Sequence, residues 1–216
     1  MLIKVINNRR VTPRRPTDLR RLMAYLLTPQ MSKDPLPSPP RLLGPPFLNG
    51  LITSHLPWGP GVDAAVADMA VQMVDYCRAR SAGKDMPDAW YAHVIFSFAP
   101  KASGDLRLPP DPHASPPKAR SQAQNALRLT FDALDFLGWS AAQPGLFVVH
   151  GDRQHIHVHG ALATPIRSTS KDNVWGVMRM SRRQLWEIST MCREAFGLPE
   201  PDRVHADEHH KRWISL

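Results

Sequence analysis

Cysteine is scarce in this chain, because Cys77 and Cys192 are the only two among 216 residues and no CxxC spacing occurs. A disulfide framework and a thiolate zinc site both need more cysteines at closer spacing, so neither is expected. No apolar run approaches the roughly 18 residues of a membrane-spanning helix. The N-terminal stretch MLIKVINNRR leads into further arginines rather than into an apolar signal region. The sequence therefore predicts an intracellular protein without membrane insertion, whose chemistry does not use cysteine.

Acidic residues are too few to balance the basic ones, with 19 Asp and Glu against 27 Lys and Arg, which gives a net charge of +8. The excess is concentrated near the N-terminus, where seven basic residues stand against one acid, Asp18. These basic residues are Lys4, Arg9, Arg10, Arg14, Arg15, Arg20 and Arg21. Each phosphate neutralised by such a cluster releases condensed counterions. We interpret the cluster as a nucleic-acid contact, with a solvated basic arm that only aids solubility as the alternative.

The length suits a single domain over residues 1–216. Residues 29–61 contain nine prolines and five glycines or asparagines, which predicts an irregular insertion. Around it, apolar periodicity predicts strands and helices in alternation. The strands are expected at 2–6, 90–100, 145–152 and 155–164, and the helices at 18–27 with Thr17 as N-cap, 62–80, 118–137 and 181–196. This order predicts an α+β fold in which helices pack on a mostly antiparallel sheet.

The most informative stretch is VVHGDRQHIHVHGAL, residues 148–162. Alternate side chains of a strand share a face, so His155, His157 and His159 should project together while Ile156 and Val158 point into the other layer. His150 precedes a tight turn, and it could reach the same place from a neighbouring strand. Neutral imidazoles grouped in this way can bind a divalent cation and leave coordination positions open. Burying so many polar nitrogens without a function would be costly, so we interpret the stretch as a functional site.

The spacing H-x-D-x-x-H-x-H-x-H resembles the third motif of conjugative plasmid relaxases, which are HUH-type single-strand DNA endonucleases. Two further stretches resemble the family's other motifs in the same order. LRRLMAYLLTP places Tyr25 in a helix after the strand LIKVI, and AHVIFSF, residues 92–98, resembles the second motif. The resemblance implies a central, mostly antiparallel β-sheet with flanking helices, with the histidines on a middle strand and the tyrosine beside them.

What the resemblance implies for function is site- and strand-specific nicking of DNA by transesterification, which initiates conjugative transfer or mobilization. Tyr25 would attack the scissile phosphodiester and become linked to the 5′ phosphate, whereas the other tyrosines, Tyr76 and Tyr91, are interpreted as packing residues. The metal ligands would be His150, His157 and His159, and the ion Mg²⁺ or Mn²⁺, with Zn²⁺ also possible. Asp152 and His155 would act as catalytic residues that orient an imidazole or remove the tyrosine proton.

The same resemblance implies single-stranded DNA at an origin-of-transfer nick site as the partner, together with accessory relaxosome proteins, in the bacterial cytoplasm. One position departs from the pattern, because Ala163 stands where many relatives have an asparagine. A hydrogen bond made by that asparagine would be missing or supplied by another residue.

Two alternative functions remain open. HIHVHGA, preceded by Gln154, also resembles the histidine triad of nucleotide hydrolases and transferases, in which a histidine attacks a nucleotide phosphate without a metal. That chemistry has no use for His150, Asp152, Tyr25 or the basic cluster. The other alternative is a non-catalytic DNA-binding accessory protein that keeps the fold and the metal without cutting.

Overall fold

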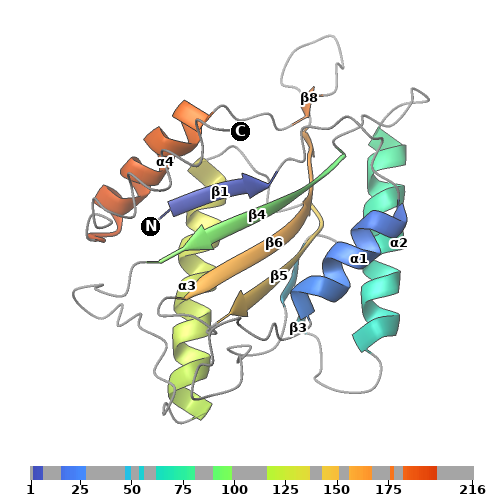
Figure 1. The fold of residues 1–216 in the computed structure, drawn as a ribbon, viewed down its shortest axis with the longest axis horizontal. Coiled ribbons are helices and arrows are strands. Elements are labelled where there is room, and N and C mark those ends of the chain that lie inside the picture. The colour runs from blue at the N-terminus through green and yellow to red at the C-terminus, as the bar shows by residue number, and fades with distance from the viewer. Residues whose placement is uncertain are drawn as a thin grey trace.

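The computed structural model describes eleven segments of the chain, and they form four helices and eight strands of an α+β fold (Figure 1). The described residues are 2–6, 16–27, 47–49, 54–55, 62–80, 90–98, 116–136, 143–150, 156–166, 176–177 and 182–198. The helices are α1 (Pro16–Leu27), α2 (Val62–Arg80), α3 (Pro116–Phe136) and α4 (Arg182–Ala195). The strands are β1 (Leu2–Ile6), β2 (Phe47–Asn49), β3 (Ser54–His55), β4 (Tyr91–Ser97), β5 (Gly145–His150), β6 (His157–Ala163), β7 (Pro165–Ile166) and β8 (Gly176–Val177).

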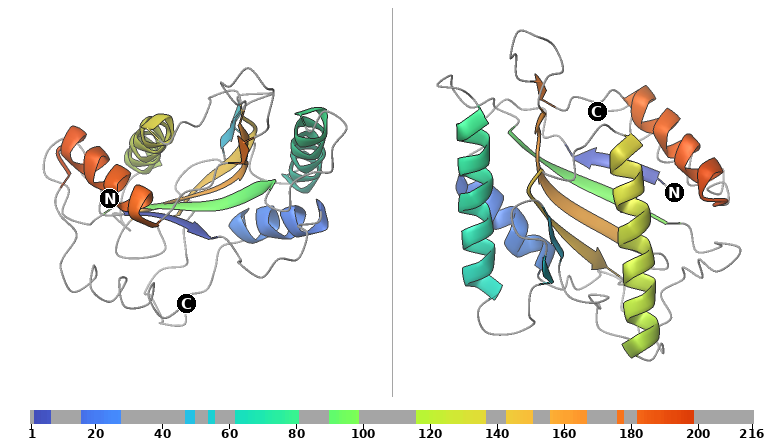
Figure 2. Two further views of the ribbon diagram at one scale, coloured as in Figure 1. Left: turned by 90° about the horizontal axis from the view of Figure 1, so that it is seen from above. Right: turned by 180° about the vertical axis from the view of Figure 1, so that it is seen from behind.

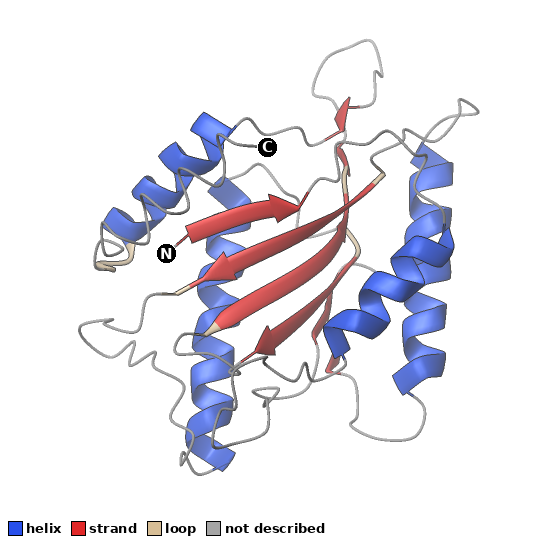
Figure 3. Cartoon of the chain, in the orientation of Figure 1, coloured by secondary structure: helices blue, strands red, loops and turns tan. Residues whose placement is uncertain are grey.

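Six of the strands form one antiparallel sheet in the order β1-β4-β6-β5-β2-β3, and β7 pairs with β8 separately. Strand β6 lies inside the sheet and pairs with β4 on one side and with β5 on the other. Helices flank the strands on both sides (Figure 3). No helix in the described part of the chain is both long enough and apolar enough to cross a membrane.

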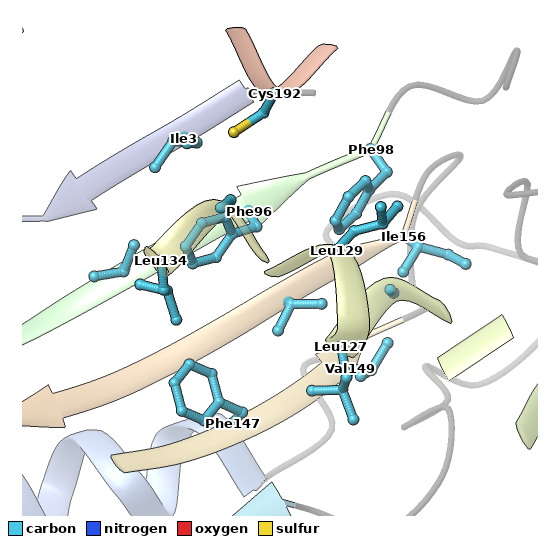
Figure 4. Packing of buried hydrophobic residues seen from close by; sticks show 14 of the residues in the cluster. Ile3, Phe96, Phe98, Leu127, Leu129, Leu134, Phe147, Val149, Ile156 and Cys192 are labelled. Atoms are coloured by element: carbon cyan, nitrogen blue, oxygen red, sulfur yellow. The ribbon is translucent and has the colours of Figure 1, made fainter. Parts of the chain in front are cut away.

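The two faces of the sheet pack against different pairs of helices, as the view from above shows (Figure 2). On one face, Phe96, Phe147 and Val149 pack with side chains of α3 and α4, such as Leu129 and Cys192 (Figure 4). The other face meets α1 and α2, which contribute a second buried cluster. That cluster contains Leu19, Met23, Leu26, Val66, Met69, Ala70, Met73, Val74, Cys77, Trp90, Tyr91, Leu146, Val148, Ala161 and Ala163. The sheet is therefore the middle of three layers.

Most elements agree with the periodicity of the sequence, and the differences have physical causes. Helices α1 and α3 begin at Pro16 and Pro116, two residues before the predicted starts. Proline suits the first turn of a helix, because its missing N–H has no partner to lose there. Thr17 therefore lies inside α1 rather than at its N-cap, and Asp18 lies in the first turn, where a negative charge favours the helix dipole.

Four short strands were not predicted from the sequence. β2 and β3 lie within the proline-rich range 29–61 and extend the sheet beyond β5. With β7 and β8, these strands have two or three residues each, which is too short for apolar alternation to appear.

Candidate functional site: a histidine cluster beside Tyr25

Four histidines share the face of the sheet that meets α1 and α2. His150 ends β5, His157 and His159 lie on β6, and His93 lies on β4. The strand register brings them together. His150 of β5 pairs directly with His157 of β6, and His159, two residues further along β6 on the same face, pairs with Val148. His93 pairs with Ala161, which places it diagonally from His159. The alternation predicted from the sequence is confirmed for the described positions, since Ile156 and Val158 belong to the core on the other face.

A glycine allows β5 and β6 to pack closely behind the histidines. Gly160 pairs with Phe147, and an added Cβ at Gly160 would lie only 2.8 Å from Phe147 Cε1. The bare glycine backbone thus allows the buried Phe147 ring to lie over β6. This contact lies on the face opposite the histidines, at the residue that follows His159.

The imidazole rings lie close to one another. The ring centroids of His150 and His159 are 4.5 Å apart, and those of His157 and His159 are 6.2 Å apart. His93, His150 and His157 are buried, and both ring nitrogens of His157 are shielded from solvent. His159 is half-buried, as are Ile95 and Ser97 on the neighbouring strand. Among these four histidines, His159 is therefore the one that solvent reaches most readily.

His150 contacts the end of the helix that carries Tyr25. Its Nε2 lies 2.8 Å from the carbonyl oxygen of Leu26, the penultimate residue of α1. The last carbonyls of a helix lack partners within the helix, and a nearby histidine can donate to them. Because a carbonyl oxygen only accepts, Nε2 of His150 donates this hydrogen bond. In neutral His150 the ring lone pair is therefore on Nδ1.

Tyr25 lies beside the cluster rather than in the core. Its side chain is 48% exposed, whereas Leu26 and Met23 of the same helix are fully buried. The ring meets the ring of His93 edge to face, with centroids 6.4 Å apart and planes at 75°. By contrast, Tyr91 is buried in the core and Tyr76 packs against it, as predicted from the sequence. Tyr25 is thus the tyrosine whose ring is open to solvent and next to the histidines.

The remaining predicted site residues are only partly accounted for. Arg20 and Arg21 are exposed on α1, and Lys4 belongs to β1, where it pairs with Ile95. Asp152 and His155, together with Arg9, Arg10, Arg14 and Arg15, lie outside the described residues.

Ala163, where relaxases often have an asparagine, is buried, and its backbone forms two hydrogen bonds. Its carbonyl oxygen accepts one from the Gln143 side chain at 3.1 Å, and its N–H donates one to the Pro144 carbonyl oxygen at 3.0 Å. The position is therefore part of the packed core.

His93 is the site residue that sequence reasoning missed. Its Nε2 lies 3.0 Å from Nδ1 of His159, and the two rings are stacked with centroids 5.3 Å apart. A single histidine in the apolar strand AHVIFSF looks like a core residue. The period of two along that strand would have put His93 on one face with Ile95 and Ser97, but only the register shows that this face adjoins His159.

The four histidines offer nitrogen donors of the kind that bind metal ions. Among the described residues, no group of three or more His, Cys, Asp or Glu side chains has a geometry that would hold an ion. The donor types nevertheless suit one, since imidazole binds Mn²⁺ and Zn²⁺. The ring centroids, 4.5 Å apart for His150 and His159 and 6.2 Å apart for His157 and His159, do not by themselves bring the ring nitrogens to one point. The rings would therefore have to move to bind one ion together.

Comparisons with protein-family models, with curated proteins and with solved structures found no match to this chain. The functional assignment therefore depends on the residues and their arrangement.

Proposed function

We propose that this protein nicks single-stranded DNA by transesterification, in the manner of conjugative relaxases, with Tyr25 as the nucleophile. The observation that carries the proposal is the position of Tyr25, exposed to solvent and in contact with the histidine cluster through His93. Three segments that resemble the three relaxase motifs, α1, β4 and β5–β6, meet at this one place. Their order in the sequence alone does not require this meeting.

The reaction would exchange one phosphate ester for another. The Tyr25 oxygen forms a bond to phosphorus, the bond from phosphorus to the 3′ oxygen breaks, and that oxygen leaves as a 3′ hydroxyl after taking up a proton. The tyrosine proton passes to a base, for which Asp152 or His155 is proposed. The number of phosphate esters is unchanged and nothing is oxidised or reduced.

The histidines would supply the metal ligands. His150 would bind through Nδ1, because its Nε2 donates to the Leu26 carbonyl oxygen, and His157 and His159 would complete the set. A divalent ion such as Mn²⁺ or Mg²⁺, once bound, would neutralise charge that develops on the scissile phosphate. Through the ion, the three histidines would help to hold the phosphate in line with the Tyr25 oxygen.

The basic residues would hold the DNA strand. Arg20 and Arg21 are exposed on α1, the helix that carries Tyr25. A strand that contacts them would run past Tyr25 toward the half-buried side chains of His159, Ile95 and Ser97. We further propose that the substrate is an origin-of-transfer nick site in the bacterial cytoplasm, with relaxosome proteins as partners.

The deciding experiment is a search for the covalent intermediate. The protein is incubated with a library of single-stranded oligonucleotides and Mn²⁺, and adducts are detected on a denaturing gel. Wild type and the control Tyr76→Phe should form an adduct, and Tyr25→Phe should not. Because Tyr25 is exposed, removal of its hydroxyl should change stability by less than about 0.5 kcal/mol.

An adduct with Tyr25→Phe would place the nucleophile elsewhere. DNA binding by wild type without any adduct would favour the accessory DNA-binding alternative. Hydrolysis of nucleotides without an adduct would favour the histidine-triad alternative.

A further inference from the structure

We infer that His93 is a positioning residue that joins the nucleophile to a metal ligand, by fixing His159 through a hydrogen bond and Tyr25 through a ring contact. This inference rests on the proposed function for its purpose, but each of its two contacts can be tested without any nicking activity.

The first contact is the hydrogen bond between His93 Nε2 and His159 Nδ1, 3.0 Å long. One of these nitrogens carries the shared proton and the other accepts it. If His159 offers Nε2 to a metal, its Nδ1 must carry the proton and His93 Nε2 must accept. His93 would thus select both the tautomer and the ring direction of His159, as carboxylates and carbonyls do for many metal-binding histidines.

The second contact is the meeting of the Tyr25 and His93 rings edge to face. The side chain of Tyr25 is 48% exposed, and the ring of His93 contacts it from the sheet. His93 itself is buried on β4, a strand paired on both sides. A side chain held by packing in this way is well suited to orient an exposed one.

Two substitutions separate the contacts. His93→Phe keeps an aromatic ring against Tyr25 but removes the nitrogen that bonds to His159. His93→Gln keeps a polar group close to the position of Nε2 but removes the ring. A residue that only filled space would respond to both changes in the same way.

The His159 contact is measured by nitrogen-15 NMR of the histidine rings, in metal-free protein and with Zn²⁺, and by calorimetric titration with Mn²⁺. We expect His159 to be protonated on Nδ1 in wild type and in His93→Gln, and to lose this preference in His93→Phe. The affinity for Mn²⁺ should fall by roughly 10- to 100-fold in His93→Phe, and His93→Gln should restore most of it.

The Tyr25 contact is measured by fluorine NMR of protein labelled with 3-fluorotyrosine, which gives three signals because the chain has three tyrosines. Tyr25→Phe assigns its signal, and Tyr76, a residue of α2 that packs against the buried cluster on that side of the sheet, serves as the internal control. The Tyr25 signal should shift in His93→Gln and change little in His93→Phe.

The inference would be overturned by an unchanged His159 tautomer and Mn²⁺ affinity in His93→Phe, or by an unchanged Tyr25 signal in His93→Gln. Failure of the proposed function would look different. The NMR and calorimetry results would then be as expected, but the wild-type protein would form no DNA adduct.

Discussion

Substituting Gly160 by alanine tests how the sheet holds the histidine cluster. The new methyl group would lie 2.8 Å from Phe147 Cε1 and 3.1 Å from both Phe147 Cδ1 and Leu162 Cδ2. Carbon atoms pack best at about 3.5–4.0 Å, so the Phe147 ring must move by several tenths of an ångström. Phe147 is fully buried, and the centroid of its ring lies 4.9 Å from that of Phe131, so the Phe147 ring has little space into which it can move.

The magnitude follows from two opposing effects. Overpacking of a core costs about 1–3 kcal/mol. Replacing glycine by alanine also restricts the unfolded chain, which returns about 0.4–1 kcal/mol. The net loss should therefore be on the order of 0.5–2 kcal/mol, and with about 2–4 °C per kcal/mol in a chain of this size, Tm should fall by roughly 1–8 °C.

The assay is thermal and urea unfolding of a double-mutant cycle with Phe147→Val, which removes the ring that the methyl group meets. In the Phe147→Val background the clash is gone, so Gly160→Ala should be neutral or slightly stabilising, with a coupling energy of about 0.5–3 kcal/mol. Mn²⁺ affinity, measured alongside, should fall in Gly160→Ala, because His159 precedes the displaced residue. Equal destabilisation in both backgrounds would refute the proposed role of Gly160.

Two further predictions concern the DNA-binding surface and the end of α4. Arg20 and Arg21 are exposed on α1, so replacing both by alanine should reduce the slope of log affinity for single-stranded DNA against log salt by up to about 1.4. Arg183→Ala, an exposed change on α4 across the sheet, should leave the slope as in wild type, and equal slopes in all variants would contradict a DNA contact on α1. Gly197 has φ of 61°, and Leu198 N donates to the Arg193 carbonyl oxygen at 2.8 Å, which is the Schellman pattern of a helix end. Gly197→Ala should cost about 1–2 kcal/mol in urea unfolding and Gly197→Asn less, whereas an alanine variant as stable as wild type would be inconsistent with this turn.

The sequence was a good guide where a segment is long and periodic. The strand LIKVI and the helix at 62–80 have the predicted bounds, and the other long elements differ by at most a few residues at their ends. The starts of α1 and α3 were predicted two residues too late; for α1, Thr17 was taken as the N-cap, whereas the helix begins at Pro16. A proline can stand just before a helix or in its first turn. Which of the two applies depends on the residues that follow the proline.

The candidate site was only half predictable for a different reason. Alternation along one strand is a local property, so His157 and His159 could be placed on one face from the sequence. Which strand lies beside that face is a property of the sheet order, and β4 is separated from β6 by a long stretch of chain that includes α3 and β5. His93 therefore became visible as a neighbour of His159 only through the pairing of β4 with β6.

The contacts around Tyr25 form a closed chain that begins and ends at α1. The Tyr25 ring contacts His93, and His93 shares a hydrogen bond with His159. The ring of His159 lies against that of His150, and His150 donates a hydrogen bond to the carbonyl oxygen of Leu26, the residue next to Tyr25. Because every link involves a histidine of the sheet, the position of α1 and the orientation of the imidazoles depend on each other. A substitution that loosens the last turn of α1 should therefore disturb the proposed metal ligands, even if the altered side chain does not contact them. Likewise, a substitution at a ligand should disturb Tyr25, even if the altered side chain does not contact Tyr25.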